Sequence, residues 1–364
     1  MGISERQDRI DVSRLDYGER KPYKDGEIRT EALEYALKNY REIYIPAGKY
    51  YVDRSLIIGS DTKIIADENA EIILVKGTKT LLIRNESVID GSFAAIADGA
   101  PFDRNITITG GVWGEENTER LGYGKTGCYD EADGFHGVST CMLISGVKGL
   151  TIENVTFRST AGFACQVGRI EDFRIENLRF DRCFADGLHV GGGVRRGVIR
   201  NLYGHTEDDL VALNAYDWDD SSINFGPIED LVVNGIKAAG GENVHKSFRI
   251  QPGVYPYPRG GAEDCYIKNL TVRNVTGVTT FKTDKPEKNV GVGRFENIIF
   301  ENVTADTTSP VDRQPNYLGG DPITGNFATF EVGSNVRGLA FRDVRVSLDR
   351  QKYPNSYFMI AGPK

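Results

Sequence analysis

Short segments in which apolar and polar residues alternate recur along most of the chain, and most of them end in asparagine. Such segments are Ile106–Gly110, Leu150–Asn154, Phe173–Asn177, Val198–Asn201, Leu231–Asn234, Tyr266–Asn269, Ile298–Asn302 and Leu339–Asp343. A period of two is typical of β-strands, and its repetition at a nearly constant interval is typical of a solenoid with stacked strands. The pattern therefore predicts an all-β parallel β-helix with rungs from about residue 43 to about residue 350.

The asparagines that end these segments indicate where the rungs are short and where they are long. They stand at positions 154, 177, 201, 234, 269 and 302, so that two short steps are followed by three longer ones. The longer steps correspond to rungs with insertions of about ten residues, which is where solenoids carry functional loops. Asparagine tolerates the left-handed conformation and can hydrogen-bond to its stacked neighbour, so we interpret the ladder as structural.

Residues 30–41 depart from the strand pattern and predict a helix. Thr30 can cap its N-terminus, and Leu33, Ala36, Leu37 and Tyr40 form one apolar face. We expect this helix to cover the open end of the solenoid, in a cap of about residues 1–42. The segment 43–52 is then the first rung, with its corner at Pro46 and Gly48.

Composition agrees with one elongated domain over residues 1–364. The chain has 42 glycines for tight corners and 40% apolar residues for a long, narrow core, and a solenoid grows by adding rungs rather than domains. The formal charge of −8, without a basic stripe, argues against nucleic acid as a partner. No apolar run approaches the length of a membrane span, and the oligomeric state cannot be inferred.

The N-terminus has neither the basic nor the apolar region of a secretory signal, so we expect a cytoplasmic protein, or a secreted one whose signal was removed. The five cysteines are odd in number and lack CxxC spacing, which disfavours both disulfides and a zinc site. We expect buried thiols, with Cys165 and Cys183 in the cores of consecutive rungs.

Three carboxylates are the strongest candidates for chemistry. Asp208 follows Asp186 by about one rung of the predicted solenoid, and Asp209 comes directly after it. Stacked rungs are ~4.8 Å apart, so these side chains should meet. Hydrolysis of a glycosidic bond needs one protonated and one ionised carboxyl group, and crowding like charges separates their pKa values. An isolated Asp-Asp pair is usually a solvated turn, but the presence of Asp186 one rung away favours catalysis.

These motifs resemble the polygalacturonase-like glycoside hydrolases, glycoside hydrolase family 28. The resemblance runs with gaps from about residue 25 to 350 and includes segments 25–26, 30–33, 45–50, 67–72, 108–113, 185–187, 207–209 and 248–250. It implies a right-handed, pectin-lyase-like β-helix and an inverting hydrolase without a cofactor or metal. It also implies that Asp208 is the general acid, while Asp186 and Asp209 hold the attacking water.

The sequence departs from the family where the substrate's uronate is bound. The family's Asn-Thr is Phe184-Ala185, its Gly-His-Gly is absent, and its Arg-Ile-Lys is Arg249-Ile-Gln251. We therefore expect a carbohydrate substrate that differs from galacturonan. Arg249 and Gln251 are candidate substrate contacts, for one carboxylate or for hydroxyls.

Other candidate substrate contacts are histidines and loop aromatics. If Leu188 and Val190 point inward, His189 points the same way as Asp186. His205 comes shortly before the acidic pair, and each of the two histidines could orient a carboxylate or bind a sugar hydroxyl. Further candidates are His245, which could replace the family's histidine, and Trp218 and Tyr255, which could stack on sugar rings or simply pack their loops.

Three functional classes remain open: an inverting glycoside hydrolase, which we favour, a polysaccharide lyase, and a non-catalytic carbohydrate-binding or tailspike-like solenoid. A lyase would use Arg249 or a lysine as base and the carboxylates to hold calcium. The acidic segment 217–220 could also supply calcium ligands, but it lacks a defined ligand loop, so a solvated insert is favoured.

Overall fold

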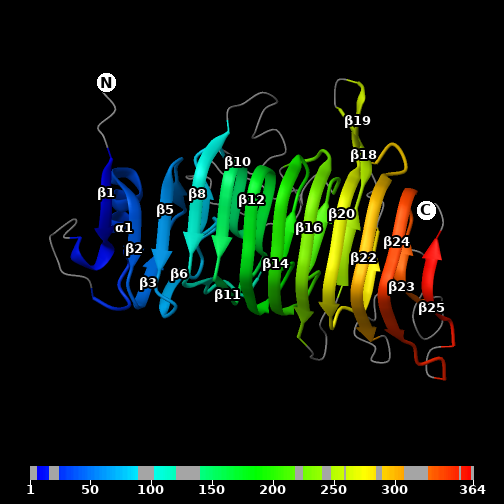
Figure 1. The fold of residues 1–364 in the computed structure, drawn as a ribbon. Helices are drawn as coiled ribbons and strands as arrows, with labels where there is room; N and C mark the ends of the chain where they lie inside the picture. The colour runs from blue at the N-terminus through cyan, green and yellow to red at the C-terminus, as the bar shows by residue number, and fades with distance from the viewer. Residues whose placement is uncertain are drawn as a thin grey trace.

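The computed structural model shows a stack of parallel strands that runs from one end of an elongated molecule to the other (Figure 1). It describes residues 6–15, 24–88, 102–119, 140–217, 224–239, 247–257, 260–283, 289–306, 327–351 and 354–361. The strands form three parallel sheets that the chain visits in turn, so the predicted parallel β-helix is confirmed.

Sheet one begins with β1 (Gln7–Asp11), β2 (Tyr40–Ile45), β5 (Thr62–Ala66) and β8 (Asp103–Thr109), followed by the second half of β10 (Thr140–Glu153) and the middle of β12 (Phe163–Cys183). It continues with the first halves of β14 (Val194–Thr206), β16 (Ile228–Ala238), β20 (Ile267–Thr276), β22 (Arg294–Asp306) and β24 (Asn335–Ser347). Sheet two contains β3 (Gly48–Val52), β6 (Ala70–Leu74), β9 (Val112–Glu115) and β11 (Thr156–Arg158), followed by the last residues of β12 and of each later long strand.

Sheet three contains β4 (Leu56–Ile58), β7 (Ile83–Asn85), the first residues of β10 and β12, and then β13 (Leu188–Val190), β15 (Val211–Asn214), β17 (Ser247–Gln251), β21 (Thr280–Lys282), β23 (Phe327–Val332) and β25 (Ser356–Ala361). An antiparallel hairpin of β18 (Gly253–Pro256) and β19 (Ala262–Cys265) projects from the stack between β17 and β20 (Figure 1).

The core lies inside the three sheets. Along sheet three, Cys165 pairs with Leu188, Leu188 with Val211, and Val211 with Phe248, and all four side chains are buried. Cys183 is buried as well, so the prediction of two core thiols is confirmed. The alternation of side chains in a strand directs the residues between these positions outward.

The asparagine ladder exists, but its register differs from the sequence-based one. Asn154, Asn177 and Asn201 all have positive φ, and the amides of Asn177 and Asn201 each donate to the asparagine of the preceding rung at 2.9 Å. In the next rung the corner residue is Gly235, because Asn234 pairs with Arg200. The left-handed position is thus one residue later than predicted, but Asn234 is still part of the ladder, because its side-chain oxygen accepts the Asn274 amide at 2.6 Å.

Asn269 belongs to a second ladder, at the corner before sheet one. There the Asn269 amide donates to Asp230 at 2.7 Å, and the Asn297 amide donates to Asn269 at 3.0 Å. The first ladder continues through Asn274 and Asn302. Sequence spacing alone cannot separate two corners that both favour asparagine.

A short α-helix packs at the N-terminal end of the stack, as predicted, although its details differ. Helix α1 comprises Thr30–Asn39 and follows a 3-10 turn, η1 (Val12–Arg14). Thr30 is the first helical residue rather than the cap, and its hydroxyl donates to Asp53 at 2.6 Å. Tyr40 begins β2, and β1 adds a strand before the predicted first rung.

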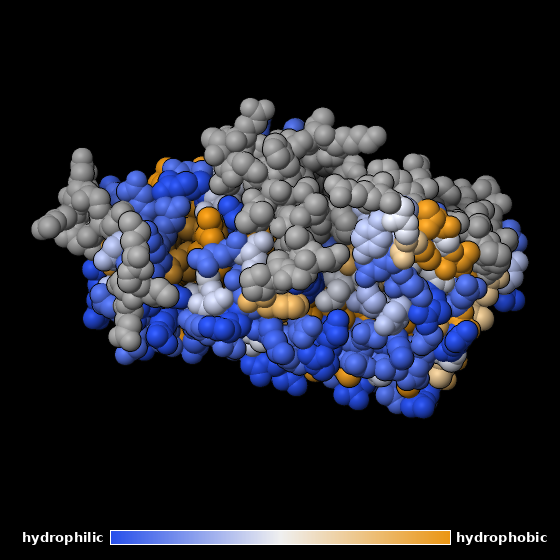
Figure 2. All heavy atoms as spheres, turned by 90° about the horizontal axis from the view of Figure 1, so that it is seen from above, coloured by the Kyte–Doolittle hydropathy of each residue, from blue (hydrophilic) through white to orange (hydrophobic). Residues whose placement is uncertain are grey.

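The stack also extends further at its other end than the sequence pattern indicated. Strand β25, beyond the predicted limit of about residue 350, pairs in parallel with β23. Its Tyr357, Phe358 and Met359 are partly exposed. Figure 2 shows mainly hydrophilic residues on the visible described surface, with smaller apolar areas. No helix among the described residues has the length and apolar character needed to span a membrane.

Candidate active site

The candidate site lies at the corner between sheets two and three, where consecutive rungs place Asp186 just before β13 and Asp208 and Asp209 just before β15. Leu188 pairs with Val211, so the two rungs stack directly on each other here. The corner is tight, because a Cβ atom at Gly187 would lie 2.7 Å from the carbonyl oxygen of Leu210. Glycine therefore allows the two rungs to approach, and the carboxylates with them.

The three predicted carboxylates meet. One side-chain oxygen each of Asp186, Asp208 and Asp209 lies within 4.8 Å of the other two. No other group of three or more metal-binding side chains occurs among the described residues. Asp186 and Asp209 are buried, whereas Asp208 is only partly buried, so Asp208 has the most accessible carboxyl group of the three.

Burial and the neighbouring Asp208 carboxylate raise the pKa of Asp186 to about 6, although a hydrogen bond from His189 acts in the opposite direction. Its Oδ1 accepts the backbone N–H of Asp209 at 3.2 Å, and its Oδ2 lies 2.7 Å from His189 Nδ1. Both oxygens of Asp186 are therefore engaged. The carboxyl group is poised to change its protonation state near neutral pH.

His189 lies behind Asp186, where its ring stacks on Phe163 with centroids 4.3 Å apart. Leu188 and Val190 point into the core, so the predicted orientation of His189 is confirmed. The side chain is only 1% exposed, and its Nε2 lies 3.2 Å from Asp217 Oδ2. His189 thus orients a carboxylate, which was one of its two expected roles, and leaves no nitrogen for a sugar hydroxyl.

Asp217 is part of this buried arrangement rather than of a solvated insert. The Asn214 amide donates to its Oδ2 at 2.8 Å, and the side chain is 1% exposed. Burial lowers the pKa of His189, but the hydrogen bond with Asp186 and the contact with the Asp217 carboxylate outweigh it and raise this pKa to about 9. His189 therefore carries a positive charge at neutral pH.

Asp209 is surrounded by cationic and hydroxyl groups. Its Oδ2 lies 2.7 Å from Arg249 Nε, its Oδ1 lies 3.4 Å from Lys282 Nζ, and Ser247 donates its hydroxyl to Oδ1. Asp209 is 0% exposed. The resemblance implied that Asp209 holds the attacking water. In this arrangement the side chain has no surface open to water and serves instead as the counter-ion of Arg249 and Lys282.

Two of the other predicted contacts, Gln251 and Tyr255, are buried, whereas His205 is partly exposed. His205 is on the outer side of sheet two, because its neighbours Gly204 and Thr206 are buried. Gln251 is fully buried and donates to the carbonyl oxygen of Tyr216 at 2.9 Å. Tyr255 is 7% exposed and packs on Phe225, with centroids 4.7 Å apart, so it supports its loop instead of offering a face to a sugar. His245 and Trp218 lie outside the described residues.

Sequence reasoning missed Lys282 and Ser247 and misinterpreted Asp217. Lys282 pairs with Arg249 in the register of sheet three. The rung of Arg249 has Gln251 where the family has lysine, and Lys282 supplies an ammonium group from the next rung. The signal was the polar residue that follows an apolar one in Thr280–Lys282, the same alternation that marks Arg249. It could be used only if the length of the rung between positions 249 and 282 were known.

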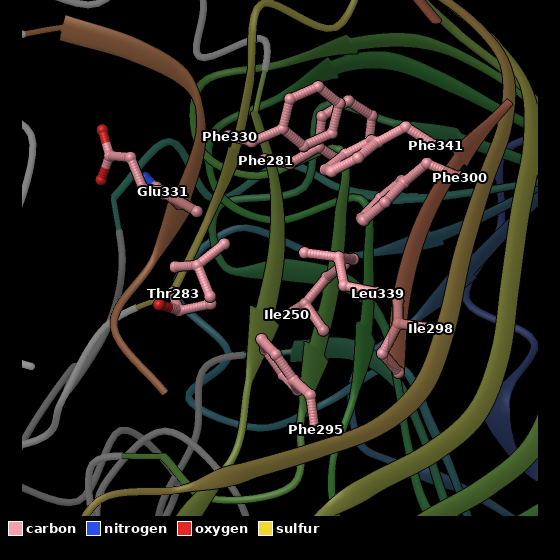
Figure 3. Close-up of a pocket in the computed structure, with 12 residues that line it drawn as sticks. Ile250, Phe281, Thr283, Phe295, Ile298, Phe300, Phe330, Glu331, Leu339 and Phe341 are labelled. Carbon is pink, nitrogen blue, oxygen red and sulfur yellow. The ribbon is translucent and has the colours of Figure 1, made fainter. Parts of the chain in front are cut away.

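A second hollow lies inside the last rungs and is chemically unlike the carboxylate corner. Its cavity volume is only about 20 Å³, and Phe281, Phe300, Phe330 and Phe341 turn toward one another within it (Figure 3). Glu331 points away from this aromatic cluster in the same view. Lys282 and Glu331 belong to its lining, but the surface of the hollow is almost entirely hydrocarbon, so the hollow is part of the core and the carboxylate corner is the candidate site.

No protein-family model matches the sequence, and no curated protein sequence is similar enough to assign a family. Solved structures do resemble the fold. A 1,3-α-1,4-β-D-galactose-4-sulfate-3,6-anhydro-D-galactose-2-sulfate 4 galactohydrolase has a TM-score of 0.55 at 12% identity, over 98% of this chain and 91% of the other. An ι-carrageenase complexed to ι-carrageenan fragments has a TM-score of 0.54 at 12% identity, over 98% and 92%.

A mutant tailspike protein of Escherichia coli bacteriophage HK620, in complex with a hexasaccharide, has a TM-score of 0.57 at 12% identity. The match covers 96% of this chain and 59% of the tailspike. Identities this low show the fold alone. The chain is a right-handed parallel β-helix, and its structural neighbours include both carbohydrate-cleaving and carbohydrate-binding proteins.

Proposed function

We propose that this protein is a glycoside hydrolase that cleaves a glycosidic bond in an oligosaccharide or polysaccharide with inversion at the anomeric carbon. The observation that carries the proposal is the meeting of Asp186, Asp208 and Asp209 within 4.8 Å at one corner. The three groups differ in exposure and in partners, as an acid and a base must. Carbohydrate ligands of the structural neighbours support the substrate class.

Asp208 is the proposed general acid, because it is the most accessible of the three and can reach the oxygen of the leaving group. Asp186 is the proposed base that takes a proton from the attacking water. Asp209 contributes through its backbone N–H, which donates to Asp186, and through its ion pairs with Arg249 and Lys282. The charge of Asp208 also affects Asp186, since the two carboxylates repel each other.

The test is the release of reducing ends from a diverse panel of oligosaccharides by the wild type and by Asp208→Asn. We expect the variant to lower kcat at least ~10³-fold with little change in stability, because general acid catalysis typically contributes 10²–10⁴. Asp230→Asn, at another corner carboxylate that accepts an asparagine hydrogen bond, is the matched control and should keep wild-type activity. A fully active Asp208→Asn would refute the assignment, and a wild type inactive on the whole panel would refute the hydrolase.

A polysaccharide lyase is the second candidate, favoured by one observation: the same three oxygens are spaced as ligands of a single cation. Arg249 and Lys282 argue against it, because they already neutralise Asp209. Calcium dependence and an ultraviolet-absorbing unsaturated product would indicate the lyase. Hydrolysis that continues in the presence of a chelator, without such a product, would indicate the hydrolase.

A further inference from the structure

We propose that Asp217 and His189 form a buried carboxylate–imidazolium relay that fixes the orientation and the ionisation of Asp186. His189 and Asp217 are then positioning residues, since they act through Asp186 and do not touch the substrate. The proposal deepens the proposed function and rests on it for its catalytic consequence.

The contacts of the two ring nitrogens of His189 determine how many protons His189, Asp186 and Asp217 share. Nδ1 is hydrogen-bonded to Asp186 Oδ2 at 2.7 Å, and Nε2 is in ion-pair contact with Asp217 Oδ2 at 3.2 Å, outside hydrogen-bond geometry. A neutral imidazole has one N–H, so one of these contacts would then place a nitrogen lone pair against a carboxylate oxygen. Two protons must therefore be shared among the three groups. Because histidine is the more basic partner, both protons reside on the ring.

The surroundings hold this arrangement in place. Phe163 covers one face of the ring, the Asn214 amide fixes Asp217, and the exposed fractions of His189 and Asp217 are both 1%. Water can therefore neither screen the charges nor replace a lost partner. A charged hydrogen bond in such a site is stronger than at the surface, and removing one partner is costly.

Several charged groups face the relay. Asp186 faces Asp208 and Asp209 from the corner before β15, and Asp209 is in turn paired with Arg249 of β17 and Lys282 of β21. Burial and the Asp208 carboxylate favour the protonated form of Asp186, whereas the imidazolium favours the ionised form. The relay therefore opposes the protonation of the base that burial would otherwise cause.

Loss of the Asp217 charge should weaken the relay in a defined direction. With only one carboxylate left, the buried imidazolium loses its proton more easily, so the pKa of His189 falls. Asp186 then loses its cationic partner, and its pKa rises above about 6. Activity requires ionised Asp186, so the acidic limb of the pH profile should move to higher pH.

The experiment measures pH profiles of kcat/KM and the NMR titration of the His189 ring in the wild type, Asp217→Asn and Asp172→Asn. In Asp217→Asn, we expect the acidic limb to move to higher pH and the pKa of His189 to fall, each by about one pH unit or more. A one-unit shift of the limb lowers activity about tenfold near pH 5 and leaves it almost unchanged near pH 8. Asp172→Asn, at an exposed carboxylate paired with Arg196, should leave both measurements unchanged.

Wild-type His189 should titrate well above the ordinary histidine value of ~6.5, and this measurement needs no variant. The proposal would be overturned if wild-type His189 titrates near ~6.5, or if the acidic limb of the Asp217→Asn profile stays where it is in the wild type. A rise in KM alone in Asp217→Asn would also overturn it, because that would indicate a role in substrate binding. If the wild type cleaves no carbohydrate, the proposed function fails while the NMR titration still tests the relay.

Discussion

At the scale of single residues, the surroundings of three neighbouring aspartates separate their roles. Asp208 is partly exposed, Asp186 is buried against an imidazolium, and Asp209 is buried against Arg249 and Lys282. Identical side chains one rung apart can thus present an accessible acid, a base with a raised pKa and a permanent counter-ion. Environment rather than residue type sets the protonation state.

Stereochemistry is the sharpest residue-scale prediction. Carboxyl groups are usually ~6.5–9.5 Å apart in inverting and ~5–5.5 Å apart in retaining glycosidases, so the close approach within 4.8 Å would by itself favour retention. We nevertheless expect inversion, because Asp186 and Asp209 are buried, so that a water between the sugar and Asp186 is needed to reach the anomeric carbon. NMR of the first-formed product should show the inverted anomer. A retained anomer, or a trapped covalent intermediate, would mean that one of these carboxylates is the nucleophile.

The sequence was sufficient for the carboxylate cluster, because one short rung without any insertion brings its members together. It was not sufficient for Lys282 and Asp217. Lys282 is separated from Arg249 by a longer rung, which contains the β18–β19 hairpin. Asp217 returns to His189 through a loop after β15, and no periodicity predicts the path of a loop.

At the scale of elements, the corners determine the register. Each rung turns through a residue with positive φ, and asparagine or glycine occupies the corner after sheet one at positions 154, 177, 201, 235, 274 and 302. Strand alternation predicts where strands lie but not which of two adjacent polar residues takes the left-handed position. The error of one position at Asn234 arose in this way, since asparagine and glycine both suit a corner.

Asn177 offers a test of what the ladder contributes to stability. Its amide donates to Asn154 and its oxygen accepts from Asn201, both at 2.9 Å, and its φ is 54°. Asn177→Ala should reduce the free energy of unfolding by about 2 kcal/mol, because it loses both hydrogen bonds and alanine is strained at positive φ. Asn177→Gly loses the same hydrogen bonds without the strain and should cost about half as much. Chemical denaturation of the two variants measures both values, and equal losses would show that the corner conformation contributes nothing.

At the scale of the whole molecule, stacking makes a long site from short strands. The outward positions of sheet three pass from Gln166 to His189, Ala212, Arg249 and Lys282 in successive rungs. These positions repeat every ~4.8 Å along the stack, so each rung adds one side chain to the wall of the site or to the layer directly behind it. Specificity can therefore change through a single residue in one rung while the core beneath it stays the same.

The charge of this row leads to the prediction about substrate. With Asp208 protonated as the proposed acid, the carboxylates of Asp186, Asp209 and Asp217 balance the three cations of His189, Arg249 and Lys282, so these groups together carry no net charge. Lys282 does place an ammonium group in the site. However, both it and Arg249 are paired with Asp209, and their side chains are only 6% and 10% exposed. Neither is positioned to receive a uronate carboxylate.

We therefore expect polygalacturonate to be a poor substrate in comparison with a neutral or sparsely charged oligosaccharide. The absence of one charge-assisted hydrogen bond, worth ~1.5–3 kcal/mol, weakens recognition tenfold or more. The matched comparison uses polygalacturonate and the same polymer after chemical reduction of its carboxylates to alcohols, so that only the charge differs. If the acidic polymer is cleaved with a kcat/KM above ~10⁴ M⁻¹s⁻¹, the low end of ordinary enzymes, then Arg249 and Lys282 must exchange Asp209 for the substrate when it binds.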